Sequence, residues 1–125
     1  MGRDYRKLIA WQRADALAME TYLASRTFPK EEIYGLTSQL RRAALSAPTN
    51  LAEGMARRTI ADKLHFLTIA EASLSEAGYL LDFAHRLGYL PKPDFGKLFM
   101  LHMEAARTLR GLARRIETDP DSESP

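Results

Sequence analysis

The sequence predicts an all-α protein with the architecture of an antiparallel, up-and-down four-helix bundle. Apolar residues recur at steps of three and four through most of the 125 residues, which is the spacing of one helix face. No stretch alternates between apolar and polar residues for long enough to indicate a strand. Breaks in the helical spacing are few and short, near residues 26–29, 57–59 and 88–93. Long helices with short connections pack as antiparallel neighbours around one core.

The first two helices are expected at about residues 5–24 and from residue 29 to about residue 55. Pro29 suits a first helical turn because the N–H that proline lacks has no helical partner there. Glu31 and Glu32 then favour the positive end of the helix dipole. The expected core face of the first helix consists of Leu8, Trp11, Ala14 or Asp15, Ala18 and Tyr22. That of the second consists of Ile33, Leu36, Leu40, Ala43, Ala44, Ala47, Leu51 and Met55.

The third and fourth helices are expected at about residues 59–87 and 93–116. Thr59 and Asp62 have the spacing of a capping box, and Gly88 suits the position that follows a helix end. The core seam of the third helix alternates strictly between steps of three and four: Leu67, Ala70, Leu74, Ala77, Leu81 and Ala84. The corresponding residues of the fourth helix are Leu98, Leu101, Ala105, Leu109, Leu112 and Ile116.

The charge of the chain is unevenly distributed. Lys and Arg number 18 and Asp and Glu 16, a formal charge of +2, but residues 117–125 hold four acidic residues and no base. We therefore divide the chain into a bundle, residues 1–116, with 18 basic and 12 acidic residues and a charge of +6, and an acidic tail, residues 117–125, that is expected to be disordered. Arginine outnumbers lysine 13 to 5, which suits bidentate contacts with phosphate or carboxylate.

The composition also excludes several classes of protein. Without cysteine there is no disulfide framework, thiolate metal site or thiol nucleophile, and a reducing cytoplasm is the expected location. No apolar run approaches the roughly 18–20 residues of a membrane span. The first 15 residues lack the apolar core of a secretory signal.

The sequence offers no catalytic, metal or cofactor site. It contains no G-x-S-x-G, no P-loop and no G-x-G-x-x-G. Asp62 and His65, and likewise Asp82 and His85, have the spacing of a metal-binding pair on a helix. The two pairs lie about 30 Å apart along one helix, however, too far to share a metal. We therefore expect a protein that is not an enzyme and that binds no metal or cofactor.

Apolar residues extend beyond the expected core faces. The third helix carries a second row, Phe66, Ile69, Leu80, Phe83 and Leu87, and the first adds Ile9, Leu17, Met19 and Leu23. A helix in a monomeric bundle needs only one apolar stripe of about 100°. The wider stripes favour a second buried face and therefore a homo-oligomer. A thick core with a few exposed apolar residues is the alternative.

Residues 34–58 form an unusually polar stretch of the second helix. Pro48 removes one backbone hydrogen bond there, so it is expected to kink the helix or to leave the carbonyl of Ala44 free. A polar row stays near one side of the helix: Gln39, Arg42, Ser46, Asn50, Glu53 and Arg57. We favour a structural hydrogen-bond network, buried or between subunits, for this row. A ligand or phosphate site is the alternative.

The same stretch carries a resemblance to a known family. The runs YGLTSQLRRA at residues 34–43 and SAPTNLAEG at residues 46–54, followed by Arg57, resemble the signature of the intervening-sequence proteins encoded within 23S ribosomal RNA genes. Residues 8–12, Phe28 with Pro29, and residues 66–76 resemble the same family, so the resemblance spans roughly residues 4–116. Ala47 departs mildly from the family pattern, in which isoleucine is usual before the proline.

The resemblance implies a four-helix bundle and, from related members, a ring-shaped homopentamer. A related branch, the accessory proteins of diversity-generating retroelements, consists of basic pentamers that bind nucleic acid and a reverse transcriptase. Most free-standing members have no established activity. The resemblance therefore strengthens the expectation of a homo-oligomeric ring and only inclines the function toward RNA or DNA.

The basic residues fall into four groups, which are the candidate nucleic-acid-binding residues: Arg3, Arg6, Lys7, Arg13, Arg41, Arg42, Arg57, Arg58, Arg107, Arg110, Arg114 and Arg115. A ring would repeat each group and make the assembly strongly positive, which favours salt-dependent binding of RNA or DNA phosphates. Because no aromatic residues are interleaved among the bases, base readout is not expected. The alternative is a structural or adaptor assembly whose partner is another protein. Bases clustered on one face favour the first function, and scattered, ion-paired bases favour the second.

Overall fold

The structure is a computed structural model that describes residues 4–118 as four long helices. These are α1 (Ile9–Ala24), α2 (Leu36–Met55), α3 (Ile60–Arg86) and α4 (Lys92–Thr118). Short 3-10 helices lie before α1 (Tyr5–Lys7) and between α1 and α2 (Ser25–Thr27 and Lys30–Glu32). No strand occurs within residues 4–118. The predicted all-α class and its four helices are confirmed.

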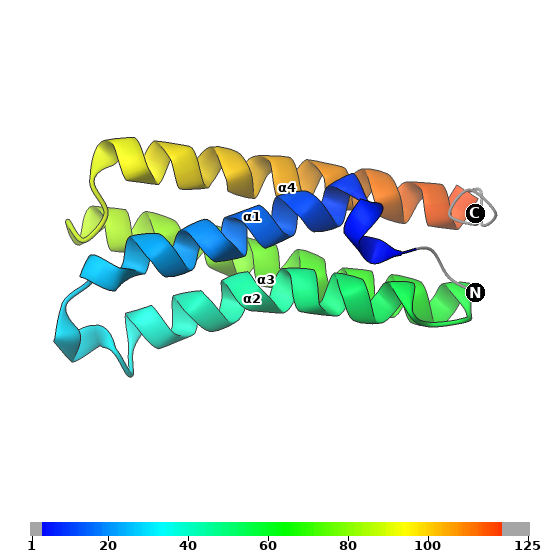
Figure 1. Cartoon of the computed structure of the whole chain (residues 1–125), viewed down its shortest axis with the longest axis horizontal. Coiled ribbons are helices and arrows are strands. Elements are labelled where there is room, and N and C mark those ends of the chain that lie inside the picture. Colours follow the sequence, from blue (N-terminus) through cyan, green and yellow to red (C-terminus); the bar gives the residue numbers. More distant parts are fainter. Residues whose placement is uncertain (1–3, 119–125) are drawn as a thin grey trace.

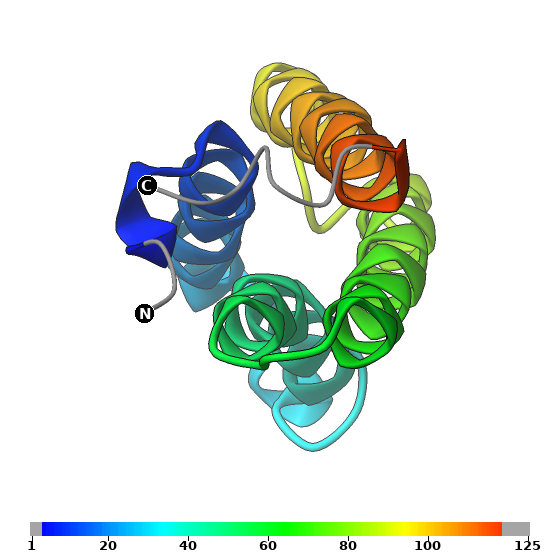
Figure 2. The ribbon, with the colours of Figure 1, turned by 90° about the vertical axis from the view of Figure 1, so that its right-hand side faces the viewer.

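The helices lie side by side along one long axis. In Figure 1, α1 runs from right to left, α2 returns to the right, α3 runs to the left and α4 returns again. Seen from the end, the helices occupy the corners of a square (Figure 2). Each helix packs against its neighbours in the sequence, and α1 also packs against α4. One end of the bundle therefore collects the start of α1, the end of α2, the start of α3 and the end of α4.

The ends of α3 are set by local signals that the sequence predicts correctly. The Thr59 hydroxyl oxygen accepts a hydrogen bond from the Asp62 amide at 3.0 Å and caps the helix start. At the other end Gly88 adopts a φ of 83°, in the left-handed region that glycine tolerates. The Gly88 amide donates to the His85 carbonyl and the Tyr89 amide to the Ala84 carbonyl, which is the Schellman pattern.

The expected start of the second helix is wrong by seven residues. Instead of entering the helix at Pro29, the chain forms the 3-10 helix Lys30–Glu32, and α2 begins at Leu36. The Glu32 carboxylate accepts a hydrogen bond from the Leu36 amide at 3.1 Å, so it caps α2 from outside the helix. Its other oxygen accepts a hydrogen bond from the Tyr89 hydroxyl at 3.0 Å, which raises the Tyr89 pKa. Ile33 consequently leaves the core face and is 49% exposed.

The core follows the predicted seams closely except in α1. All six seam residues of α3 are buried, as are those of α2 from Leu36 onward and of α4 apart from half-buried Leu101. In α1 the buried stripe is rotated toward Leu17, which has 0% exposure although the sequence places it outside the core. Trp11 lies half-buried at the edge of the stripe, and Tyr22 is exposed. The buried positions of α1 are mostly small: Ala10, Ala14, Leu17, Ala18 and Thr21.

The second apolar rows are divided between core and surface. Leu17 and Leu80 are buried within the bundle, and Phe66, Ile69 and Phe83 are half-buried. The remaining members are exposed, together with further apolar residues on α2, α3 and α4; the larger exposed ones include Ile9, Met19, Leu23, Leu45, Tyr79, Leu87, Met100 and Met103. This apolar surface is available for contacts outside the bundle.

The remaining expectations concern Pro48, the tail and the membrane. α2 continues through the buried Pro48 as one helix. α4 extends two residues beyond the expected bundle boundary, through Thr118, and residues 119–125 of the predicted tail lie outside the described residues. Within residues 4–118, no helix combines the length and the apolar character needed to cross a membrane.

Candidate nucleic-acid interface

Three arginines share the outer face of α4. Arg107, Arg110 and Arg114 follow at steps of three and four, so they lie on one side of the helix, away from the buried Leu109 and Leu112. All three are exposed, and no ion pair joins them to an acidic residue of the described chain. We call these three residues the α4 arginine face. It is a short row of guanidinium groups with donors free to bind phosphate oxygens.

Further bases lie at the end of the bundle where α2 and α4 finish (right in Figure 1). Arg57 and Arg58 follow α2, and Arg114 and Arg115 belong to the last turns of α4. The 3-10 helix before α1, which contains Arg6 and Lys7, lies at the same end. We call these six residues the basic end. The fold thus brings together basic residues from three parts of the sequence, which lie up to about a hundred positions apart.

Two members of the basic end are already paired. Arg6 binds Asp4 at 3.1 Å, and its hydrogen bonds lower the pKa of the Asp4 carboxyl group. Arg57 binds Glu53 at 2.8 Å and its guanidinium lies 4.7 Å from the centroid of the Phe66 ring. Both pairs are exposed, so each contributes little to stability and leaves donors for a ligand.

The other candidate bases have structural contacts. Arg13 faces Glu104 across α1 and α4 at 3.8 Å. Arg41 is half-buried; it donates to the Ser25 hydroxyl at 2.8 Å and to the Tyr22 carbonyl at 3.3 Å, and it therefore ties α2 to the end of α1. Arg42 is exposed and donates to the Ser38 hydroxyl at 2.8 Å. Arg3 lies outside the described residues.

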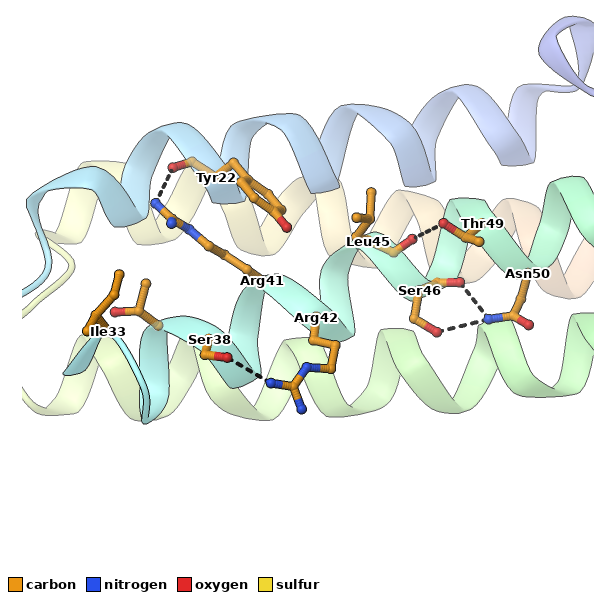
Figure 3. Close-up of a pocket in the computed structure, with 10 residues that line it drawn as sticks. Tyr22, Ile33, Ser38, Arg41, Arg42, Leu45, Ser46, Thr49 and Asn50 are labelled. Carbon is orange, nitrogen blue, oxygen red and sulfur yellow. Dashed lines mark hydrogen bonds between the residues drawn. The ribbon is translucent and has the colours of Figure 1, made fainter.

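A groove of about 560 Å³ lies beside the polar stretch of α2, between that helix and the end of α1 (Figure 3). Figure 3 shows that Arg41 reaches toward Tyr22 of α1, whereas Arg42 points away from it. A phosphate site in this stretch requires the two guanidinium groups to converge on one anion. They do not converge here. Thr37, which also lines the groove, is 2% exposed, and its hydroxyl has no hydrogen-bond partner among residues 4–118.

The polar row of α2 does not form one continuous network but several small groups of hydrogen bonds and ion pairs, some of which reach α3. The Asn50 side-chain amide donates to both the carbonyl and the hydroxyl oxygen of Ser46, each at 2.9 Å. The Ser73 hydroxyl of α3 donates to the same Ser46 hydroxyl oxygen at 2.8 Å. Glu53 and Arg57 form the ion pair of the basic end, and Gln39 reaches Glu76 of α3 at 3.5 Å. Ser46 and Asn50 are thus part of the α2–α3 contact.

Sequence reasoning assigned the row to α2 alone and did not include its α3 partners. Ser73 is buried, and it stands one residue before the seam residue Leu74. A serine beside a strictly apolar seam was the available signal, because a buried hydroxyl requires a hydrogen-bond partner.

Replacing Asn50 with alanine is expected to lower the free energy of unfolding by about 1 kcal/mol, because two hydrogen bonds near the α2–α3 contact are lost. Chemical denaturation measures the change. Thr49→Ala is the matched control, since Thr49 is exposed and its hydroxyl donates only to the Leu45 carbonyl of its own helix. Equal stability of the two variants would contradict a structural role for Asn50.

The histidines have roles in packing. His85 places Nδ1 2.8 Å from the Leu90 carbonyl oxygen, and its ring stacks on Phe95. Asp82 forms an ion pair with Arg86 at 2.9 Å. Burial lowers the pKa of His102, which favours the neutral form of its imidazole. Among residues 4–118, no three acidic or histidine side chains form a group that could hold a metal.

Comparisons with known proteins agree with the fold and the signature. The model of the 23S rRNA-intervening sequence proteins matches residues 6–111. The structure is similar to the crystal structure of a protein of unknown function from the S23 ribosomal protein family of Bacteroides thetaiotaomicron, with a TM-score of 0.76 and 17% identity over 85% of this chain and 99% of that one. At this identity the likeness concerns the fold alone. No curated protein matches the sequence. Because the family match covers most of its length, the chain belongs to the family of 23S rRNA-intervening sequence proteins.

Proposed function

We propose that this up-and-down bundle is the protomer of a ring-shaped homo-oligomer, a pentamer by family resemblance, that binds the sugar-phosphate backbone of RNA or DNA in the cytoplasm without catalysing a reaction. The observation that carries the proposal is the α4 arginine face, three exposed guanidinium groups in one row without acidic partners in the described chain. Phosphate contacts of this kind give binding without sequence readout.

The position of the basic end supports the same function. Arg114 belongs to both the α4 arginine face and the basic end, so the two surfaces are continuous along α4. Because charges of one sign raise each other's potential, a continuous basic surface attracts a polyanion more strongly than the same charges scattered over the molecule. A ring would repeat this surface in every protomer.

The adaptor alternative also has a supporting observation. Arg13 and Arg41 are engaged within the bundle, and the groove of Figure 3 is flanked by the exposed apolar residues Tyr22, Ile33 and Leu45. A groove with an apolar wall and fixed polar groups suits a segment of another protein. In that function the exposed bases of α4 contribute only solubility.

Titration of the purified protein with structured and with single-stranded RNA tests the proposal. We expect the protein to bind RNA at low salt. The logarithm of the association constant is expected to fall linearly with the logarithm of the salt concentration, because each phosphate contact releases counterions. The measurement is fluorescence anisotropy at two or more salt concentrations. Absence of binding at low salt, or an affinity independent of salt, contradicts the phosphate mechanism and leaves the adaptor function.

The oligomer is tested separately by light scattering. We expect a mass that is a multiple of the 14.1 kDa of the chain, because exposed apolar side chains on α1, α2 and α4 lose contact with water in an assembly. A mass of one chain at micromolar concentration contradicts the ring without affecting the nucleic-acid titration.

A further inference from the structure

A second groove, of about 520 Å³, runs between α3 and α4 beside the α4 arginine face. Aromatic side chains from both helices line it: Tyr79 from α3, and Phe95, Phe99 and His102 from α4. The rings of Phe95 and Phe99 lie 5.5 Å apart between centroids, and those of Phe99 and His102 lie 5.3 Å apart. The groove therefore contains a continuous row of flat side chains, a surface that stacks well against planar groups.

Tyr79 is the exposed member of this lining. Its side chain is 59% exposed, and its ring packs at a tilt against Phe83 with 6.1 Å between centroids. An exposed aromatic ring supported on one side by another ring has a face available to a ligand. The cost of ordering such a ring is small because tyrosine has few rotatable bonds.

Gly78, next to Tyr79, lets the His102 ring of α4 pack against the backbone of α3. A Cβ atom at this position would lie 2.5 Å from Nε2 of His102, so only glycine lets the imidazole lie this close to the backbone of α3. Among the described residues that line the groove, Arg110 is the only arginine or lysine.

Arg110 connects this groove to the arginine face. Its side chain also lines the groove formed with Met100, Met103 and Arg107, and the groove formed with Thr68 and Arg114. A chain of phosphates bound by Arg107, Arg110 and Arg114 would therefore meet the aromatic groove at Arg110. Because Tyr79 lines the same groove as Arg110, this groove is where a base attached to that chain would meet an exposed aromatic ring.

The acidic residues of the groove favour a base over a phosphate. Two carboxylates line the groove: Asp82, which is paired with Arg86 at 2.9 Å, and Glu71. A carboxylate repels phosphate but accepts hydrogen bonds from the amino groups of bases. Aromatic walls with an acceptor at the edge thus fit an uncharged, planar group that carries N–H donors.

We infer that the groove between α3 and α4 is a nucleobase subsite, in which an unpaired base of a single strand stacks on Tyr79 while the flanking phosphates lie on the α4 arginine face. The inference rests on the proposed function and makes it more specific. Bases in a duplex already stack on each other and pair along their edges, so only single-stranded regions can present a base to this groove. The protein is therefore expected to prefer single strands or loops over continuous duplex.

Tyr79→Ala tests the inference, with Tyr79→Phe as the matched control that keeps the ring. Affinities of the full chain for a mixed-sequence single-stranded RNA and for a duplex of the same length are measured over a range of salt concentrations. Loss of one stacked base is expected to weaken single-strand binding by about 5- to 100-fold. The salt slope stays unchanged, because no phosphate contact is lost. Tyr79→Phe is expected to bind as the unaltered protein does, and duplex binding is expected to be the same for all three.

Three outcomes overturn the inference. Tyr79→Ala could bind the single strand with unchanged affinity, it could weaken single strand and duplex equally, or it could lower the mass of the assembly, which would show that the groove contacts another copy. In each case a salt-dependent affinity of the unaltered protein still supports the proposed function. Failure of the unaltered protein to bind either RNA refutes both.

Discussion

Replacement of Arg107, Arg110 and Arg114 together with glutamine is expected to lower the affinity for RNA by two to three orders of magnitude at about 0.1 M salt. Each phosphate contact contributes a slope of about 0.7–0.9 in log affinity against log salt, so three contacts account for about two to three decades at this concentration. Glutamine has nearly the same helix propensity as arginine, and all three side chains are exposed. The variant is therefore expected to fold, and its salt slope to fall by about 2–3.

The matched control removes the same charge from the other end of the bundle. Arg26, Lys30 and Lys92 are exposed, and they lie where α1 ends and α4 begins. Their joint replacement with glutamine lowers the net charge equally but leaves the α4 arginine face intact. We expect a loss of less than about tenfold, from the long-range potential alone. Equal losses in the two variants would show that net charge, and not this surface, governs binding.

The parts of the fold that the sequence predicts correctly depend on neighbours along the chain. The α3 seam is predicted by spacing alone, and its two ends by Thr59 and Gly88, because capping and left-handed glycine turns act within a few residues. The outer position of Arg107, Arg110 and Arg114 also follows from helical spacing relative to the α4 seam.

The errors arise where a distant partner decides the outcome. Glu32 looks like a residue of a first helical turn, but bonds to the Leu36 amide and to the Tyr89 hydroxyl hold it outside α2. The helical spacing assigns Trp11 and Tyr22 to the core face of the first helix and leaves Leu17 outside that face. Ala14 and Ala18 are buried as predicted, but Leu17 and Thr21 are buried beside them whereas Tyr22 is exposed. The contact of Glu32 with Tyr89 and the packing of other helices on Leu17 cannot be identified from the spacing of residues within one helix.

The aromatic groove also depends on contacts between residues that are distant in the sequence. The sequence shows no aromatic residues interleaved with the bases, so base contacts were not expected. Tyr79 lies in α3 and Phe99 in α4, and the packing of these two helices places them beside Arg110. The combination of stacking surface and positive charge exists only in the tertiary structure.

Gly54→Leu is expected to lower the free energy of unfolding by about 2–3 kcal/mol, which corresponds to a decrease in Tm of roughly 10 °C for a domain of this size. Gly54 is buried near the end of α2, where a Cβ atom would lie 3.0 Å from Cβ of Phe66 and 3.3 Å from the Lys63 carbonyl oxygen of α3. The backbones of α2 and α3 meet here directly. A larger side chain must push the helices apart, because neither a backbone carbonyl nor a Cβ atom can turn aside.

Gly111→Leu provides the control, because glycine inside a helix is otherwise unfavourable by about 1 kcal/mol relative to a good helix former. Gly111 lies inside α4, and apart from its own stretch of helix no described atom lies within 4 Å of its would-be Cβ, so leucine there is expected to be neutral or to stabilise the protein by up to about 1 kcal/mol. Thermal unfolding of both variants at one protein concentration removes the effect of assembly on Tm. Similar stability of the two variants would contradict a close α2–α3 contact at Gly54. Opposite signs would show that the close approach of two helices requires this glycine of the family signature.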